Sequence, residues 1–325
     1  MTGPSKPLCS ISVDVDSLDS VLRFYGEKPD QTSLCDPVYD SAVPKFLDLF
    51  DEYGIKATFF VVANDCLRGS SRDVMKEVIR RGHEIANHSL NHEFAFSLLS
   101  RPDREADIRR STAMIKEACG DAPVGFRVPG YDIDEVTMDI LDAEGYLYDS
   151  SVYKFPIYPI MRRMSYVKIG SIPKKDALRG LASEVFKAIA PPAKIYRPER
   201  GRFWKPGKGR NILEIPLSVM PFLGLPFNST FLFMMGGGLF DLGFWLTNSC
   251  GMDLNYNFHS TDMLSAEADG VRVDHPGLNI DAPHKEAMFR RILEKISRNY
   301  EFRRLEALAR EDRLYIKNGS GHGSS

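Results

Sequence analysis

Short apolar runs alternate along this chain with segments whose apolar residues recur every three or four positions. The run at residues 8–15 is apolar and ends in acids, and the run at residues 56–63 contains β-branched and aromatic residues, so both are predicted to be buried strands. Residues 41–53, 102–119 and 284–298 have helical spacing, and the first two of these segments stop at a glycine. Because strands and helices alternate, the pattern favours a parallel α/β sheet or barrel.

The pattern is less regular in the middle of the chain. Residues 153–210 contain many prolines and glycines, and we interpret them as an insertion within one domain. That domain is expected to span residues 1–317. The last residues, 318–325, have the composition of a vector-derived tag remnant, and we leave them out of the chemistry.

Composition limits the classes of protein to consider. The 325 residues are 43% hydrophobic, which is enough for a full core. A net charge of −2 and the lack of a nucleic-acid-binding signature argue against a nucleic acid partner. Five cysteines without a CxxC pair suit reduced thiols, and the chain begins without an apolar signal segment. We therefore expect a cytoplasmic protein.

Polar side chains with catalytic potential follow several predicted strands. Asp14 and Asp16 end the first strand and, being two residues apart, share one of its faces. Arg127, Asp149 and His259 each end or follow a later apolar run. The carboxyl ends of parallel strands meet at one side of such a fold, so these residues are candidates for a single site. The alternative is that these polar side chains are solvated and only cap the ends of their strands.

Three of the seven histidines fall within residues 83–92. On a helical turn, His88 and His92 at positions i and i+4 would present two imidazoles to one divalent cation. His83 does not fit that turn. A histidine pair with this spacing is also common on ordinary helices, so solvated or core histidines are the alternative.

A basic segment and an apolar segment adjoin each other at residues 194–252. Residues 194–210 contain seven basic residues against one acid, and residues 215–252 contain a single charge. Prolines and glycines within the apolar part argue against a transmembrane helix. One interpretation is a barrel strand and covering helix beside a solvated loop. The other is a peripheral surface for an anionic membrane or a lipid-phosphate substrate.

Five short motifs occur in order along the chain. They are residues 12–16 (SVDVD), 88–92 (HSLNH), 126–131 (FRVPGY), 148–151 (YDSS) and 258–259 (FH). Taken together, they resemble the polysaccharide deacetylases of carbohydrate esterase family 4, which share the nodulation-type deacetylase domain. One departure is that Val15 separates the two acids, which are usually adjacent. This form is found in a branch that resembles deformylases acting on an amino sugar linked to polyprenyl phosphate.

The resemblance implies one divalent metal ion held by Asp16, His88 and His92. Zinc is the default ion for two imidazoles and a carboxylate, and cobalt, nickel or manganese would also fit. Such a site leaves coordination positions open for water and for the carbonyl of a substrate.

The resemblance also implies the acid and base groups. Asp14 would be the general base, held ionised by Arg127. His259 would protonate the departing amine, with Asp149 orienting its imidazole. A backbone N–H of the next loop would face the developing oxyanion. That loop consists of Pro129, Gly130 and Tyr131.

The sequence thus predicts a distorted (β/α)7-type barrel and a metal-dependent hydrolase. It would remove an acetyl or formyl group from the nitrogen of an amino sugar. The apolar and basic segments favour a lipid-linked sugar at the inner membrane face over a wall polymer. Two alternatives stay open: a hydrolase of a small cyclic amide or ureide, and an inactive carbohydrate- or lipid-binding module on the same fold.

Overall fold

The computed structural model describes residues 6–25, 36–267, 269 and 277–319, with side chains as far as residue 312. Within this part of the chain the main sheet has eight strands, and every pairing in it is parallel. The strands are β1 (Leu8–Val15), β2 (Thr58–Val61), β3 (Glu84–Asn87), β4 (Gly125–Phe126), β5 (Tyr148–Asp149), β8 (Leu213–Glu214), β9 (Leu254–His259) and β10 (Glu301–Phe302).

The sheet curls into a barrel around β1. β9 and β2 flank β1, and β3, β4, β5 and β8 follow β2 in turn. The chain just after β8 then meets β9, because the Ser218 N–H donates to the Asn255 carbonyl at 3.2 Å and the Asn255 N–H donates to Ser218 Oγ at 2.8 Å. β10 pairs only with Leu8 and Cys9 at the start of β1. The predicted (β/α)7-type barrel is confirmed.

The alternation of residue types along β1 separates the core from the barrel interior. Ile11, Val13 and Val15 point outward into the apolar core beneath the helices. Ser12 and Asp14 point inward, where Arg127 donates to both of them from the far side of the barrel. The interior of the barrel is therefore polar next to β1, and this places the site.

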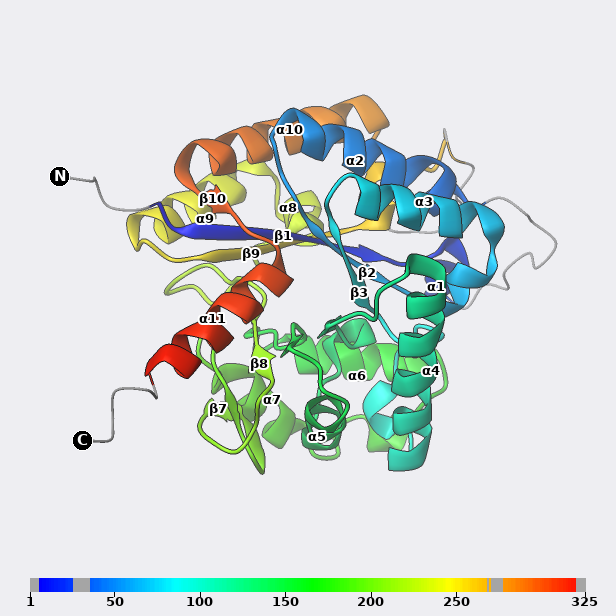
Figure 1. Ribbon diagram of the computed structural model, residues 1–325, viewed down its shortest axis with the longest axis vertical. Coiled ribbons are helices and arrows are strands. Elements are labelled where there is room, and N and C mark those ends of the chain that lie inside the picture. Colours follow the sequence, from blue (N-terminus) through cyan, green and yellow to red (C-terminus); the bar gives the residue numbers. More distant parts are fainter. Residues whose placement is uncertain (1–5, 26–35, 268, 270–276, 320–325) are drawn as a thin grey trace.

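Helices cover the outside of the barrel. In Figure 1, α2, α3 and α10 lie side by side over β1, β2 and β3. Their apolar faces bury phenylalanines such as Phe46, Phe50 and Phe289 against the sheet. The helices outside the middle of the chain are α1 (Leu18–Tyr25), α2 (Val43–Glu52), α3 (Gly69–Arg80), α4 (Arg101–Cys119), α5 (Glu135–Ala143), α10 (Ala282–Asn299) and α11 (Leu305–Gly319).

Helix α11 covers the end of the barrel where the strands begin. Leu305 packs against Phe60 and Tyr148. The buried Glu84 accepts the Glu306 N–H at 3.0 Å, the Thr58 hydroxyl at 2.6 Å and the Tyr148 hydroxyl at 2.6 Å. In Figure 1, α11 lies near the beginning of β1. The opposite end, where the strands finish, is left for the site.

The middle of the chain contains helices that the sequence pattern did not predict. Residues 153–210 hold two helices and a short hairpin, and residues 215–252 hold two short helices separated at Gly236. None of the helices in the described ranges has the length and apolar character needed to cross a membrane. These elements are α6 (Tyr158–Lys168), α7 (Leu181–Ile189), the hairpin β6 (Pro198–Glu199) and β7 (Arg202–Pro206), α8 (Ser229–Met235) and α9 (Gly237–Ser249). Short turns of other helix types occur at Val38–Ala42, Ala63–Leu67, Phe96–Leu98, Pro129–Tyr131, Lys174–Asp176 and Ser260–Met263.

Candidate active site

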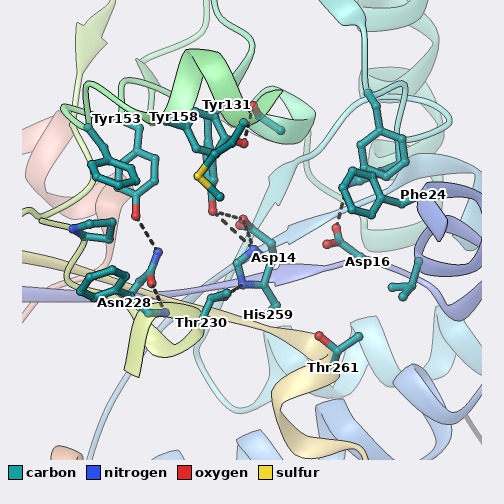
Figure 2. A pocket seen from close by; sticks show the side chains of 18 of the residues that line it. Asp14, Asp16, Phe24, Tyr131, Tyr153, Tyr158, Asn228, Thr230, His259 and Thr261 are labelled. Carbon is teal, nitrogen blue, oxygen red and sulfur yellow. Dashed lines mark hydrogen bonds and ion pairs between the residues drawn. The ribbon is translucent and has the colours of Figure 1, made fainter. Parts of the chain in front are cut away.

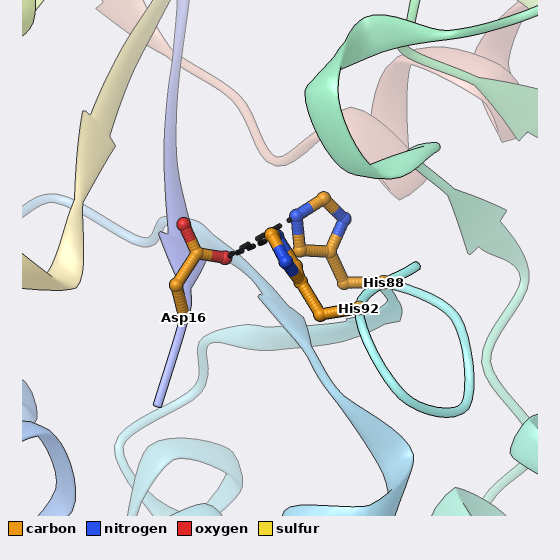
Figure 3. Close-up of side chains that lie close together, drawn as sticks. All are labelled: Asp16, His88 and His92. Atoms are coloured by element: carbon orange, nitrogen blue, oxygen red, sulfur yellow. Dashed lines mark ion pairs between the residues drawn. The ribbon is translucent and has the colours of Figure 1, made fainter. Parts of the chain in front are cut away.

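The metal-ligand candidates meet at the carboxyl ends of β1 and β3. Asp16 follows β1, and His88 and His92 belong to the loop after β3 (Figure 3). The Nε2 atoms of His88 and His92 lie 3.4 and 3.0 Å from Asp16 Oδ1. The three ligand atoms lie within 4.8 Å of one another. The structure thus brings all three predicted ligands to one point.

The two histidines do not lie on a helix, so the sequence argument from a helical turn was wrong. The loop turns at Ser89 and His92, whose φ angles are +70° and +55°. Side chains hold the turn: Asn87 Oδ1 accepts the Ser89 N–H at 2.9 Å, Ser89 Oγ accepts the His92 N–H at 3.0 Å, and Asp107 Oδ1 accepts the Leu90 N–H at 3.0 Å. These tertiary contacts, rather than helical periodicity, bring the two rings to a centroid separation of 5.0 Å.

The protonation pattern of these residues fits a divalent cation. His88 Nδ1 lies 2.7 Å from the Arg127 carbonyl oxygen, so this nitrogen donates a proton to the carbonyl and Nε2 is the nitrogen that faces Asp16. Asp16 Oδ1 and His92 Nδ1 are buried without a hydrogen-bond partner in the described part of the chain. Burial raises the pKa of Asp16, but the His92 and His88 rings outweigh it and hold that pKa well below its usual range. Two imidazoles and an ionised carboxylate form a donor set suited to zinc and similar ions.

Asp14 lies beside this group and is paired with Arg127. The Arg127 Nη1 donates to Asp14 Oδ1 at 2.5 Å, and its Nε donates to the Ser150 carbonyl at 2.8 Å. The guanidinium is wholly buried and lies 4.0 Å from the centre of the Phe60 ring. Burial raises the pKa of Asp14, but the charge of Arg127 and then that of the nearby histidines lower it below the ordinary value. Asp14 is therefore an ionised carboxylate.

His259 and Tyr131 complete a cluster around the second oxygen of Asp14 (Figure 2). Tyr131 donates its hydroxyl to Asp14 Oδ2 at 3.2 Å and lies 3.4 Å from His259 Nε2. That Nε2 is 3.7 Å from Asp14 Oδ2, and the Thr230 hydroxyl lies 3.3 Å from the other ring nitrogen. Asn257 Nδ2 donates to both Asp14 Oδ2 and the Tyr131 hydroxyl at 3.1 Å. Three polar side chains thus lie around the single oxygen atom Asp14 Oδ2.

Asp149 does not orient His259, and this prediction was wrong. Its two oxygens accept the Ser151 N–H at 3.0 Å and the Ser151 hydroxyl at 2.8 Å. Glu214, which is paired with it on β8, is also buried, and burial raises the pKa of both carboxyls. The pair is therefore part of the barrel wall, and Thr230 is the side chain next to His259 Nδ1.

The loop at Pro129–Tyr131 borders the cavity. Proline has no backbone N–H, and the Tyr131 N–H donates to the Val128 carbonyl at 3.0 Å. Gly130 lines the cavity, and its φ of +59° favours glycine. The Tyr158 hydroxyl fixes the loop by donating to the Gly130 carbonyl at 2.9 Å. Of the three loop residues named from the sequence, Gly130 is the candidate oxyanion donor.

The polar groups line the floor of an apolar cavity of about 420 Å³. Phe24 and Phe94 lie on the metal-ligand side, with Phe94 at 4.5 Å from the His92 ring centre. Other aromatic rings and methionines line the rest of the cavity. Among them are Tyr153, Phe155, Tyr158, Met161, Phe231 and Met234.

Sequence reasoning missed several of these site residues. Asn257 lies two residues before His259 on an alternating strand, so it shares a face with the histidine, and that spacing could have identified it. Tyr131 was assigned a backbone role, although its hydroxyl is the group that reaches Asp14. Thr230 and Phe24 lie on helices α8 and α1, which were not predicted, and no sequence signal marks them.

Comparisons with known proteins agree with this fold. A family model described as polysaccharide deacetylase matches residues 30–148. The peptidoglycan deacetylase of Helicobacter pylori is 28% identical over 179 residues, which cover 54% of this chain and 60% of that protein. The peptidoglycan-N-acetylglucosamine deacetylase of Bacillus cereus is 33% identical over 111 residues, which cover 34% of this chain and 49% of that protein. The chain thus matches less than two thirds of the length of these relatives.

Two solved structures resemble nearly the whole chain. A Mycobacterium smegmatis protein assigned to the polysaccharide deacetylases has a TM-score of 0.60 at 18% identity, covering 97% of this chain and 94% of its own. Puue allantoinase has a TM-score of 0.59 at 16% identity, covering 95% and 91%. At such low identity the likeness shows the fold alone.

Proposed function

We propose that this chain, whose residues 30–148 match the polysaccharide deacetylase family model, is a metal-dependent hydrolase that removes an N-acyl group from an amino sugar. The acyl group is acetyl or formyl. One observation carries the proposal. The three metal-ligand candidates lie in a single cavity beside the Asp14 carboxylate and the imidazole of His259. Binding a sugar would require neither a metal site nor an acid–base pair.

Asp16, His88 and His92 would hold the metal ion, and we propose zinc as the native ion. Cobalt, nickel and manganese suit the same ligands. When bound, such an ion polarises an acyl carbonyl and makes water more acidic. The buried Nδ1 contact to the Arg127 carbonyl fixes the orientation of the His88 ring for this purpose.

The protein side chains divide the proton transfers of amide hydrolysis between them. Asp14 accepts a proton from the attacking water, and Arg127 keeps it ionised until then. The water oxygen bonds to the acyl carbon, and the Gly130 N–H faces the negative charge that develops on the acyl oxygen. When the carbon–nitrogen bond breaks, His259 gives a proton to the leaving amine. The products are a carboxylate and a free amino sugar.

The cavity supports a substrate that carries an apolar group. Aromatic rings and methionines dominate its walls, whereas Asn228, Thr230 and Thr261 are the neutral hydrogen-bonding side chains available for sugar hydroxyls beyond the tyrosines. A polar groove would bind a polymer of linked sugars better than this apolar cavity. We therefore propose a lipid-linked amino sugar, such as one on polyprenyl phosphate, even though the curated relatives are named for peptidoglycan.

Two matched variants test the assignment of base and ligand. Asp14→Asn should retain the metal, measured by elemental analysis, and lose roughly 100-fold or more of its turnover. Asp16→Asn should lose both metal and turnover. Full activity in Asp14→Asn would exclude it as the base. Failure of purified protein to bind or be activated by zinc or cobalt would overturn the metal-dependent mechanism.

A substrate panel tests the reaction. Free and lipid-linked N-acetyl and N-formyl amino sugars are each incubated with the metal-loaded protein, and released acetate and formate are measured. A cyclic ureide belongs in the same panel because it represents the alternative reaction on this fold. Faster release from the lipid-linked sugars than from their free counterparts is the expected result. Hydrolysis of the ureide alone would contradict the proposal.

A further inference from the structure

Helix α6 presents its apolar side to solvent. Ile157, just before the helix, and Ile160, Met161 and Met164 within it are 52%, 42%, 47% and 60% exposed. They are spaced i, i+3, i+4 and i+7, so they form one continuous stripe. A helix of a soluble protein normally turns such a stripe towards the core. This stripe has no covering element in the described part of the chain.

The stripe borders the opening of the catalytic cavity. Met161 is both exposed and part of the cavity lining, and so is Met234 on α8, which is 57% exposed. Met235 beside it is 55% exposed. The substrate would therefore enter between two exposed methionines. The opening of the site is apolar on the outside as well as within.

A third apolar group projects from a tight turn near the same cavity. Phe222 is 88% exposed, and its φ of +64° is a conformation that disfavours a side chain. The turn is closed by the Met220 N–H, which donates to the Leu225 carbonyl at 2.7 Å, and it leads into Pro226, which lines the cavity. A phenylalanine held in solvent in a costly conformation points to an apolar partner outside the molecule.

Positive charge accompanies the apolar stripe. Lys168, the last residue of α6, lies 5.0 Å from the ring centre of Tyr25, which lines the cavity. Lys174, Lys175 and Arg179 follow, all exposed and without an ion pair among the described residues. Only one acid occurs in residues 168–179. Together, the apolar stripe and its unpaired cations are complementary to an anionic lipid surface.

The basic segment at residues 194–210 differs from the group of cations after α6. Its arginines are paired with acids: Arg197 with Asp312 at 2.6 Å, Arg200 with Asp142 at 3.3 Å, and Arg210 with Glu135 and Asp139. These contacts tie the β6–β7 hairpin to α5 and α11. The arginines of the segment at 194–210 are therefore neutralised within the protein, whereas Lys174, Lys175 and Arg179 after α6 are not neutralised by any residue that the structure describes.

We propose that the protein docks on an anionic lipid bilayer through the cavity rim, so that the catalytic cavity opens directly onto the membrane. The inference rests on the proposed lipid-linked substrate, whose sugar would reach Asp14 and the metal ligands from the headgroup layer. A second copy of the chain on the rim would bring like charges together, whereas anionic headgroups neutralise them. The cavity rim consists of Ile157, Ile160, Met161, Met164, Phe222 and Met234.

Flotation with vesicles tests the apolar part of the cavity rim. The full chain is mixed with vesicles of phosphatidylcholine containing phosphatidylglycerol, or of phosphatidylcholine alone, and expected to float with the first. The double variant Ile160→Ser/Met164→Ser should bind about tenfold more weakly. Ile79→Ser is the matched control, because Ile79 is 38% exposed on α3 and lies away from the rim. Equal loss in both variants would overturn the proposal.

A second pair of variants tests the positive charge after α6. Lys174→Gln/Lys175→Gln should weaken vesicle binding about fivefold for each charge removed, and salt should weaken the unmodified protein in the same way. Lys205→Gln/Lys208→Gln on the β6–β7 hairpin removes two exposed lysines that have no ion pair among the described residues, and it should change little. A larger effect of the hairpin variant would place the docking surface elsewhere.

Two further measurements separate docking from catalysis. The rim variants should hydrolyse a soluble N-acyl amino sugar at the rate of the unmodified protein, because none of the substituted side chains lines the cavity. Flotation without any N-acyl hydrolysis would refute the proposed reaction and leave the docking surface intact. Absence of flotation at low salt, or a dimer in solution that Ile160→Ser converts to a monomer, would refute docking.

Discussion

Tyr131 shows how one hydroxyl can couple the base and the acid of the site. It donates to Asp14 Oδ2 at 3.2 Å and accepts from Asn257 Nδ2 at 3.1 Å, and it lies next to His259. Tyr131→Phe should lower kcat by about tenfold to 100-fold, since a hydrogen bond to a charged group contributes roughly 1.5–3 kcal/mol. KM and metal content should stay nearly unchanged. Steady-state kinetics and elemental analysis check this.

Tyr153→Phe provides the matched control for that variant. Tyr153 lines the same cavity, but its hydroxyl accepts from Asn228 Nδ2 at 3.0 Å and has no contact with Asp14. Its removal should change kcat only by a few-fold. If the two variants lose kcat equally, the Tyr131 hydroxyl acts through the shape of the cavity and not through Asp14.

Asp65 links stability to pH at a site outside the catalytic cluster. Burial, and then the nearby charge of Asp36, raises the pKa of Asp65 to about 7. The unfolded chain has a pKa of about 3.9 there, so the folded protein holds this proton more tightly. The stability from this group is complete below about pH 4 and is lost as the pH rises to about 7.

Asp65→Asn should remove this loss, because an amide does not titrate. Relative to the variant, the unmodified protein should lose on the order of 3 kcal/mol in free energy of unfolding between pH 5 and pH 8. The Tyr39 hydroxyl, which donates to Asp65 Oδ2 at 3.0 Å, still finds an acceptor in asparagine. Urea unfolding at the two pH values measures the difference. Parallel declines in both proteins would show that Asp65 does not control it.

At the scale of elements, long periodic segments were predictable and short ones were not. β1 matches its predicted bounds, residues 8–15, because eight alternating residues carry a clear pattern. β4, β5 and β8 have two residues each, which is too few for any period to show. The positions of β4 and β5 were still indicated by Arg127 and Asp149, since polar residues after apolar runs mark strand ends.

The misread elements have identifiable physical causes. The turn at His88 and His92 depends on hydrogen bonds from Asn87 and Asp107, partners that local sequence does not reveal. Helix α6 was interpreted as an irregular excursion because its apolar stripe faces solvent and its start contains prolines. Asp149 was matched to a motif, but its distance from His259 is set by where β5 and β9 lie in the closed barrel.

The close approach of β4 and β5 explains a glycine in the barrel wall. A Cβ on Gly125 would lie only 2.0 Å from Cζ of Tyr148, the residue paired with it on β5. Gly125→Ala should therefore lower the free energy of unfolding by about 3 kcal/mol or more, because the buried tyrosine must move and its hydroxyl holds Glu84. Denaturant unfolding measures the loss.

Gly69→Ala is the control for this substitution. Gly69 begins α3 with ordinary backbone angles, and a Cβ added there would meet no atom within 4 Å. Alanine there should be neutral or stabilise by a few tenths of a kcal/mol up to about 1 kcal/mol. Comparable destabilisation by both substitutions would mean that the Tyr148 contact does not limit residue 125.

At the scale of the whole molecule, the catalytic groups depend on contacts between distant parts of the chain. Arg127 after β4 reaches Ser12 and Asp14 on β1 and Asn257 on β9, so three sides of the barrel meet at one guanidinium. The contact between Ser218 and Asn255 joins the chain after β8 to β9, which itself pairs with β1. The order of the motifs predicted which residues lie together in the site. The hydrogen-bond partners of these residues depend on the closure of the barrel, which local sequence does not reveal.

The metal ligands join two of these parts, Asp16 after β1 and the loop after β3, so metal binding should stabilise the whole fold. A ligand that binds only the folded chain adds about 4 kcal/mol when its concentration is a thousandfold above its Kd. A chelator should therefore lower the thermal midpoint of the metal-loaded protein by several degrees, measured by calorimetry without any assay of activity.

His88→Ala should melt at the same temperature with and without chelator. His83→Ala should stay sensitive to chelator although less stable overall, because His83 Nδ1 accepts the Ala57 N–H at 3.0 Å and lies outside the ligand set. A chelator response that persists in His88→Ala would place the stabilising ion somewhere other than at Asp16, His88 and His92.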